Sequence, residues 1–63
     1  MRKHYYRDLY GSTASIRTYR NGETTLTIRT YTGARVLRRT YATVRGAHIA
    51  MGQYSDTWVE QVA

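Results

Sequence analysis

The sequence predicts an α+β domain, in which a four-stranded antiparallel β-meander is followed by one C-terminal helix packed on one sheet face. Thr occurs ten times and Tyr seven times, while Pro is absent, and this composition favours strands. Gly11, Gly22 and Gly33 divide the first part of the chain into short extended runs, at the spacing of a meander. After Tyr41 the hydrophobic period changes from that of a strand to that of a helix.

The length of the chain allows one small domain, which we assign to residues 1–63. A chain of this size buries only about 60% of the surface that its unfolded form exposes. Ile, Leu and Val together number ten, and Cys is absent, so a large core and disulfide bonds are both excluded. A core this thin favours self-association, and we expect a homo-oligomer.

Four strands are expected, at residues 4–10, 13–19, 23–30 and 34–41. Between the second and third strands, a two-residue turn would direct the two apolar sets to opposite sides of the sheet. A three-residue loop, Arg20–Gly22, with a bulged turn at its glycine removes this conflict. It places Ile16 opposite Leu26. It also places Ala14 opposite Ile28.

A second three-residue loop, Tyr31–Gly33, is expected to join the third and fourth strands. It pairs Ile28 with Val36. Leu37 is also apolar and needs burial, so Val36 and Leu37 together are a candidate β-bulge that shifts this register.

Thr43 is a favourable N-cap for a helix at about residues 44–53. Residues at helical spacing form an apolar stripe that is expected to cover the apolar sheet face. The stripe contains Val44, Ala47, Met51 and Tyr54.

The tail, residues 54–63, is apolar at Trp58, Val59 and Val62. These side chains either pack on the domain or form a dimer seam, and the sequence supports both possibilities.

A short internal repeat carries the functional prediction. Ile16–Tyr19 reads Ile-Arg-Thr-Tyr, and Ile28–Tyr31 repeats it. Side chains alternate along a strand, so the Arg and Tyr of each copy face away from the core if the Ile faces it. A looser copy, Leu37–Tyr41, adds its second Arg and its Tyr if the fourth strand keeps its phase through Leu37. The candidate nucleic-acid-binding residues are Arg17, Tyr19, Arg29, Tyr31, Arg39 and Tyr41.

The charge balance supports this prediction. Lys and Arg number 10 against 4 Asp and Glu, which gives a net charge of +6. Arg offers bidentate contact to phosphate and Tyr offers a stacking plane for a base. We therefore predict binding to DNA, single-stranded or duplex, or to RNA, with weak sequence specificity and strong salt dependence. In the alternative interpretation, Tyr and Thr only form strands and Arg only solubilises the sheet.

No catalytic residue is assigned. The candidate general bases are His4 and His48, and Asp56 and Glu60 share one face if the tail is helical. A solvated tail explains that acidic pair equally well. Enzymatic activity is left open, with DNA nicking as the only activity considered. Without Cys, and with two widely separated His, the sequence predicts no metal site, and it predicts no cofactor.

Four short strands, one helix and a basic outer sheet face resemble the positive-cofactor-four type of single-stranded-DNA-binding domain. They also resemble very small anti-CRISPR proteins of phages and gut bacteria that adopt this fold. The resemblance implies an oligomer that protects phage or plasmid DNA from a Cas nuclease, with DNA nicking as an implied activity. The residues behind the comparison are Ile16–Tyr19, Ile28–Tyr31, Thr43–Ala47 and Tyr54–Trp58.

The chain is also similar to the three-strand-plus-helix module of tyrosine integrases and plant AP2-type factors. In that module the sheet enters the major groove of duplex DNA. This similarity implies that Arg17, Arg29 and Arg39 contact bases and phosphates. The additional strand expected at residues 4–10 argues against it.

A different class of function is a protein-binding inhibitor that docks on a Cas protein or another nucleic-acid enzyme. It would use the same basic face, or the tail around Trp58. No apolar run is long enough to span a membrane, and no signal peptide is recognisable at the start. We therefore expect a cytoplasmic protein without a membrane partner.

Overall fold

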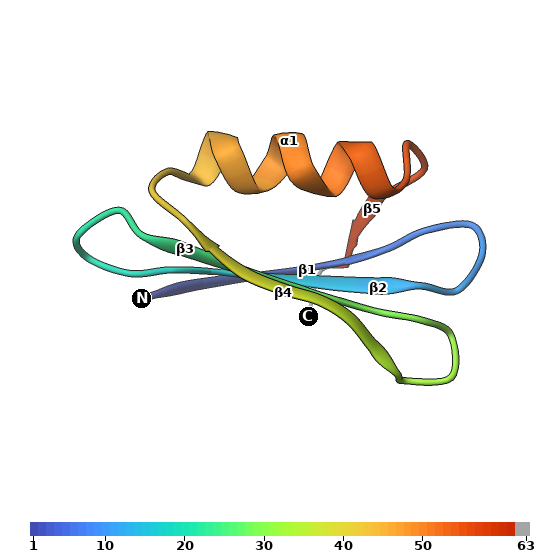
Figure 1. The fold of residues 1–63 in the computed structure, drawn as a ribbon. Coiled ribbons are helices and arrows are strands. Elements are labelled where there is room, and N and C mark those ends of the chain that lie inside the picture. The colour runs from blue at the N-terminus through green and yellow to red at the C-terminus, as the bar shows by residue number, and fades with distance from the viewer. Residues whose placement is uncertain (62–63) are drawn as a thin grey trace.

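The computed structural model describes residues 1–61 and contains a five-stranded antiparallel sheet with one helix on one face (Figure 1). The predicted α+β class is confirmed, with one strand more than expected. In sheet order, the strands run β4-β3-β2-β1-β5. The elements are β1 (Arg2–Arg7), β2 (Thr13–Thr18), β3 (Thr24–Arg29), β4 (Arg35–Tyr41), α1 (Val44–Tyr54) and β5 (Val59–Gln61).

All three turns of the meander have the same form. Gly11, Gly22 and Gly33 each adopt a positive φ, of 84°, 88° and 89°. In the β2–β3 turn, the Tyr19 N–H donates to the Glu23 carbonyl at 2.9 Å and the Gly22 N–H donates to the Tyr19 carbonyl at 3.0 Å. This is a three-residue loop closed by a left-handed glycine, so the predicted form of this turn and of the β3–β4 turn is confirmed.

The first turn corrects the strand expected at residues 4–10, because β1 ends at Arg7. The two residues after Asp8 lie in the turn. The Asp8 side chain is buried, and its Oδ1 accepts the backbone N–H groups of Tyr10 at 2.9 Å and of Ser12 at 2.8 Å. Asp8 is therefore a structural residue that holds the β1–β2 turn closed.

We predict opposite effects for alanine at two of the glycines. Gly11→Ala is expected to destabilise the fold by about 1–2 kcal/mol, because its positive φ disfavours a side chain. The new Cβ would also lie 3.1 Å from the Tyr31 Cβ. Gly52→Ala is the matched control: it meets nothing within 4 Å and is expected to stabilise α1 by up to about 1 kcal/mol. Urea unfolding measures both effects, and equal unfolding midpoints would contradict the prediction.

The β2–β3 register is as predicted: Ile16 pairs with Leu26 and Ala14 pairs with Ile28. The β3–β4 register is not, because Ile28 pairs with Leu37 and not with Val36. The register shifts next to this pair, where Val36 is the additional residue of a β-bulge and is 49% exposed. The bulge turns Leu37, in place of Val36, toward the core, where it is partly buried, and it fixes which side chains of β4 face each side of the sheet.

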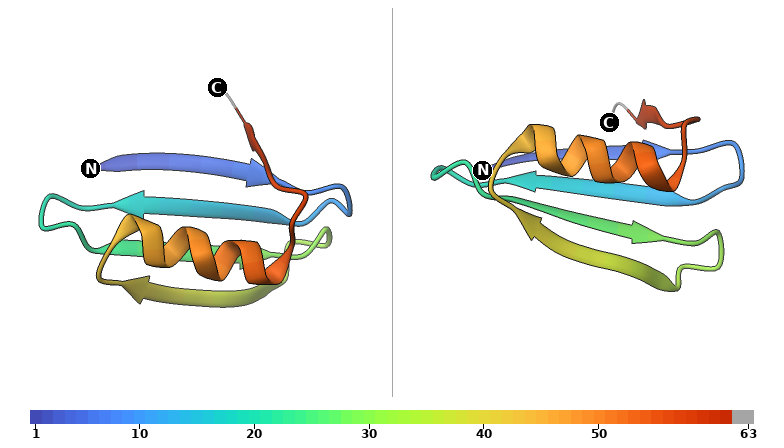
Figure 2. Two further views of the ribbon diagram at one scale, coloured as in Figure 1. Left: turned by 90° about the horizontal axis from the view of Figure 1, so that it is seen from above. Right: turned by 45° about the horizontal axis from the view of Figure 1, so that its top comes forward.

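The core lies between the sheet and α1. Thr43 is the N-cap, as predicted, and its Oγ1 accepts the Gly46 N–H at 3.1 Å. Of the predicted helical stripe only the two central residues are buried, and its two ends are exposed. The buried apolar residues are Ala14, Ile16, Leu26, Ile28, Ala47 and Met51. Seen from above, the helix lies over β3 and its neighbours and leaves β1 uncovered (Figure 2).

The tail returns to the domain. The Trp58 Nε1–H donates to the Met51 carbonyl at 2.7 Å, and its ring stacks on Tyr54 at a centroid distance of 6.1 Å. β5 then pairs with the end of β1, where Glu60 lies opposite Tyr6. The alternative in which the tail packs on the domain is therefore confirmed for Trp58, whereas Val62 lies outside the described residues. Within residues 1–61, no helix has the length and hydropathy of a membrane span.

Candidate nucleic-acid interface

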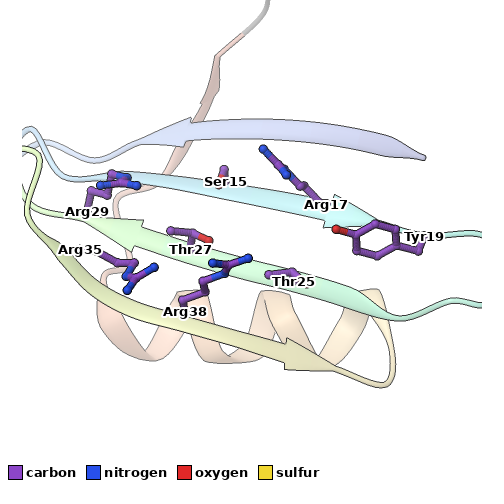
Figure 3. Close-up of a pocket in the computed structure, with 8 residues that line it drawn as sticks. All are labelled: Ser15, Arg17, Tyr19, Thr25, Thr27, Arg29, Arg35 and Arg38. Carbon is purple, nitrogen blue, oxygen red and sulfur yellow. The ribbon is translucent and has the colours of Figure 1, made fainter.

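The sheet has a second face, on the side away from α1, which we call the outer face. Its residues alternate with the buried ones along each strand and pair with one another across the sheet. Figure 3 shows the part of this face over β2, β3 and β4, with its side chains pointing away from the helix. From β1 to β4, the outer face contains Lys3, Tyr5, Arg7, Thr13, Ser15, Arg17, Thr25, Thr27, Arg29, Arg35, Arg38 and Thr40.

Small hydroxyl side chains lie at the centre of the outer face, bordered by long basic side chains and by Tyr5, which pairs with Ser15. Thr13 and Ser15 of β2 and Thr25 and Thr27 of β3 form this centre, which we call the hydroxyl floor. The floor is partly buried, and a shallow pocket of about 360 Å³ lies over its residues Ser15, Thr25 and Thr27 (Figure 3). Because the hydroxyl side chains are short, a ligand can lie close to the backbone of the sheet at the floor. The longer arginine side chains can then contact the sides of that ligand.

In the part of the chain that the structure describes, the basic residues of the outer face form no ion pair with an acidic side chain. Within residues 1–61, the only ion pair closer than 4 Å joins His4 Nδ1 to Glu60 Oε2 at 3.2 Å, on the helix side of the sheet. No residue of the outer face within the strands is acidic. Glu23 precedes β3 at one end of the face and forms no such pair.

Like charges also lie directly opposite one another on this face. Lys3 pairs with Arg17 between β1 and β2, and Arg29 pairs with Arg35 between β3 and β4. Like charges in directly opposed positions destabilise a sheet. Arg29 is also positioned by the β3–β4 turn, since its Nη1 donates to the Gly33 carbonyl at 3.0 Å. An anion bound over the face would neutralise this repulsion.

The structure brings three of the six sequence-predicted residues together. Arg17 and Arg29 lie on the outer face, and Tyr19, directly after β2, lines the same pocket. Tyr31 follows β3 and lies in the β3–β4 turn, where it is 79% exposed. It therefore lies at the end of the sheet and not on the outer face.

The expected placement of Arg39 and Tyr41 on the outer face is wrong. Arg39 pairs with Leu26 and Tyr41 pairs with Thr24, and both of these partners are buried beneath α1. The Arg39 guanidinium lies 5.5 Å from the centre of the Tyr41 ring, a cation–π contact on the helix side.

Arg35 and Arg38 occupy the corresponding places on the outer face, and neither was predicted from the sequence. The signal that could have identified them is the adjacent pair Val36 and Leu37. Choosing Leu37 as the buried residue places Arg38 on the outer face and Arg39 on the helix side.

The candidate catalytic groups lie on the helix side and do not form an acidic pair. The tail is not helical, so Asp56 and Glu60 do not share a helix face, and Glu60 contacts His4 instead. Burial, and to a lesser extent the nearby Glu60 carboxylate, raises the pKa of Tyr6 above its usual value. The His48 ring packs edge-to-face against Tyr6 at 5.9 Å. Within residues 1–61, no three His, Cys, Asp or Glu side chains converge to form a metal site.

Comparisons of the chain with protein-family models, curated proteins and solved structures find no match. The chemistry of the outer face therefore carries the functional argument.

Proposed function

We propose that this protein binds nucleic acid through its outer face, by charge-assisted hydrogen bonds from the basic side chains to phosphates. The observation that carries the proposal is the set of six cations on one sheet face with no carboxylate partner among residues 1–61. Five of the six are arginines, whose planar donors match phosphate oxygens in pairs. The sequence as a whole carries a net charge of +6, which attracts a polyanion from a distance.

The repulsion between like charges on the outer face favours a role in binding a polyanion over a role in solubility alone. A solubilising surface works best with both signs of charge interspersed. The outer face instead keeps like charges opposite one another at Lys3–Arg17 and Arg29–Arg35. A series of phosphates would relieve both repulsions together. Self-association, an anti-CRISPR role, docking on a Cas protein and DNA nicking stay predictions from the sequence.

The direct test is a salt titration of binding, in which the anisotropy of a labelled oligonucleotide is measured. If all six cations contact phosphates, affinity is expected to fall by roughly 10³-fold between about 50 mM and about 200 mM salt. The logarithm of affinity should fall linearly with the logarithm of salt concentration. Absence of binding at the lowest salt, or an affinity that salt does not change, would contradict the proposal.

A further inference from the structure

Tyr5 is an aromatic residue of the outer face, in β1. It lies directly opposite Ser15 of β2, and it is 50% exposed although it is not at an edge of the sheet. Within residues 1–61, neither of the two contacts between aromatic rings includes the Tyr5 ring. Aromatic rings are large apolar surfaces that stack on other planar groups. The exposed part of this ring is therefore available to a planar group of a ligand.

A second pocket, of about 350 Å³, lies beside the Tyr5 ring. The short side chains of Thr13, Ser15 and Thr27, from the hydroxyl floor, line it together with Tyr5. Adjacent strands lie only about 4.8 Å apart, and a serine is much shorter than a tyrosine, so the ring rises above a low surface. A planar group can thus lie against the ring and over the floor.

The pocket beside Tyr5 is continuous with the pocket that the arginines border. Ser15, Thr27 and Arg29 line both pockets. Figure 3 shows these three residues on β2 and β3, on the side of the arginines. A ligand can therefore contact the ring and the basic side chains at the same time.

A row of directly paired residues connects the two pockets across the sheet. Tyr5 pairs with Ser15, and Ser15 pairs with Thr27. Thr27 in turn pairs with Arg38 of β4. The row has a ring at one end, two short hydroxyl side chains in the middle and a guanidinium at the other end. A nucleotide has a matching order of groups, since its sugar separates a planar base from a phosphate.

We infer that the ligand of the outer face is single-stranded nucleic acid, with an unpaired base stacked on Tyr5 and the neighbouring phosphates bound by the arginines. This inference rests on the proposed function and adds the strand form of the ligand. A base inside a duplex is already stacked and paired, so its face is not free for a ring. Proteins that bind single strands combine a positively charged groove with aromatic rings that stack on bases. The stacking is assigned to a tyrosine outside the set predicted from the sequence.

The first test compares a labelled oligothymidine with an abasic deoxyribose-phosphate strand of the same length, at the same low salt. The oligothymidine is expected to bind at least about fivefold more tightly, because one stacked base contributes roughly 5- to 150-fold. Affinities within about threefold of each other would overturn the inference and leave the proposed function intact. Absence of binding by both strands would overturn the proposed function itself.

Variants of Tyr5 test which ring stacks. Tyr5→Leu should lower the affinity for oligothymidine by roughly 5- to 150-fold and change the affinity for the abasic strand by less than about threefold. Its salt slope should stay unchanged, because no charge is removed. Tyr5→Phe keeps the ring and should retain the affinity within about threefold. The matched control is Tyr10→Leu, since Tyr10 is 79% exposed in the β1–β2 turn and lines neither of the two pockets.

A duplex of oligothymidine and oligoadenine tests the strand form. Tyr5→Leu should change the affinity for this duplex by less than about threefold, and melting followed by circular dichroism verifies that the variant folds. An equal loss on the duplex or on the abasic strand would show that no unpaired base stacks on Tyr5. Unchanged affinity of folded Tyr5→Leu for oligothymidine would overturn the inference as well.

Discussion

Replacing Arg29, Arg35 and Arg38 together with Ala is expected to lower the affinity for nucleic acid by about 100- to 1,000-fold. Under the proposed function, each substitution would remove one charge-assisted phosphate contact, and contacts of this kind contribute about 1.5–3 kcal/mol before partial compensation. The slope of log affinity against log salt should fall by about three, because each lost phosphate contact lowers it by about one. Anisotropy of a labelled oligonucleotide at several salt concentrations measures both quantities.

The helix side supplies a control with the same change in charge. Arg2 and Arg39 lie on the side of the sheet that α1 covers, and Arg45 lies on α1 itself. Replacing these three with Ala removes three positive charges, as in the first variant, but leaves the outer face intact. Affinity should then change by only a few-fold. Equal losses in the two variants would show that total charge, and not the outer face, governs binding.

Leu26→Ala is expected to cost about 2–5 kcal/mol of folding free energy. Leu26 is 0% exposed and lies in β3, at the centre of the core beneath α1. A domain of 63 residues has a total stability of only about 3–9 kcal/mol, so this one substitution removes a large part of it. Urea unfolding followed by circular dichroism measures the loss.

Leu9→Ala is the matched control, because Leu9 lies in the β1–β2 turn and is 81% exposed. Its effect should stay within about 0.5 kcal/mol. If Leu26→Ala unfolds at the same urea concentration as the unsubstituted protein, the assignment of the core is wrong.

The glycine turns and the β2–β3 register were predictable because each depends on a local pattern. Gly22 requires a left-handed position, and pairing Ile16 with Leu26 keeps both on one face. The same turn form around Gly11 was missed, because Leu9 and Tyr10 are apolar or aromatic and are typical of a strand. The turn depends on Asp8, whose carboxylate closes it from within.

The arginines of β4 could not be assigned from the sequence, because Val36 and Leu37 are nearly equivalent in hydropathy. The choice between them depends on which side chain fills the space beside Ile28, and this is a property of tertiary packing. The strand β5 was also not predictable from the sequence, because it too depends on tertiary packing. Three residues carry no recognisable period, and they form a strand because Trp58 anchors the tail to the core.

The bulge at Val36 has a further consequence for protein aggregation. Among residues 1–61, β4 forms one edge of the sheet, and its outer backbone groups have no partner strand. An open edge of this kind can template fibrils by pairing with another chain, and bulges and charged side chains counter that tendency. β4 has both, with Arg35, Arg38 and Arg39 along its length. Edge-to-edge growth is thus disfavoured here, and an assembly of this protein is expected to use a different surface.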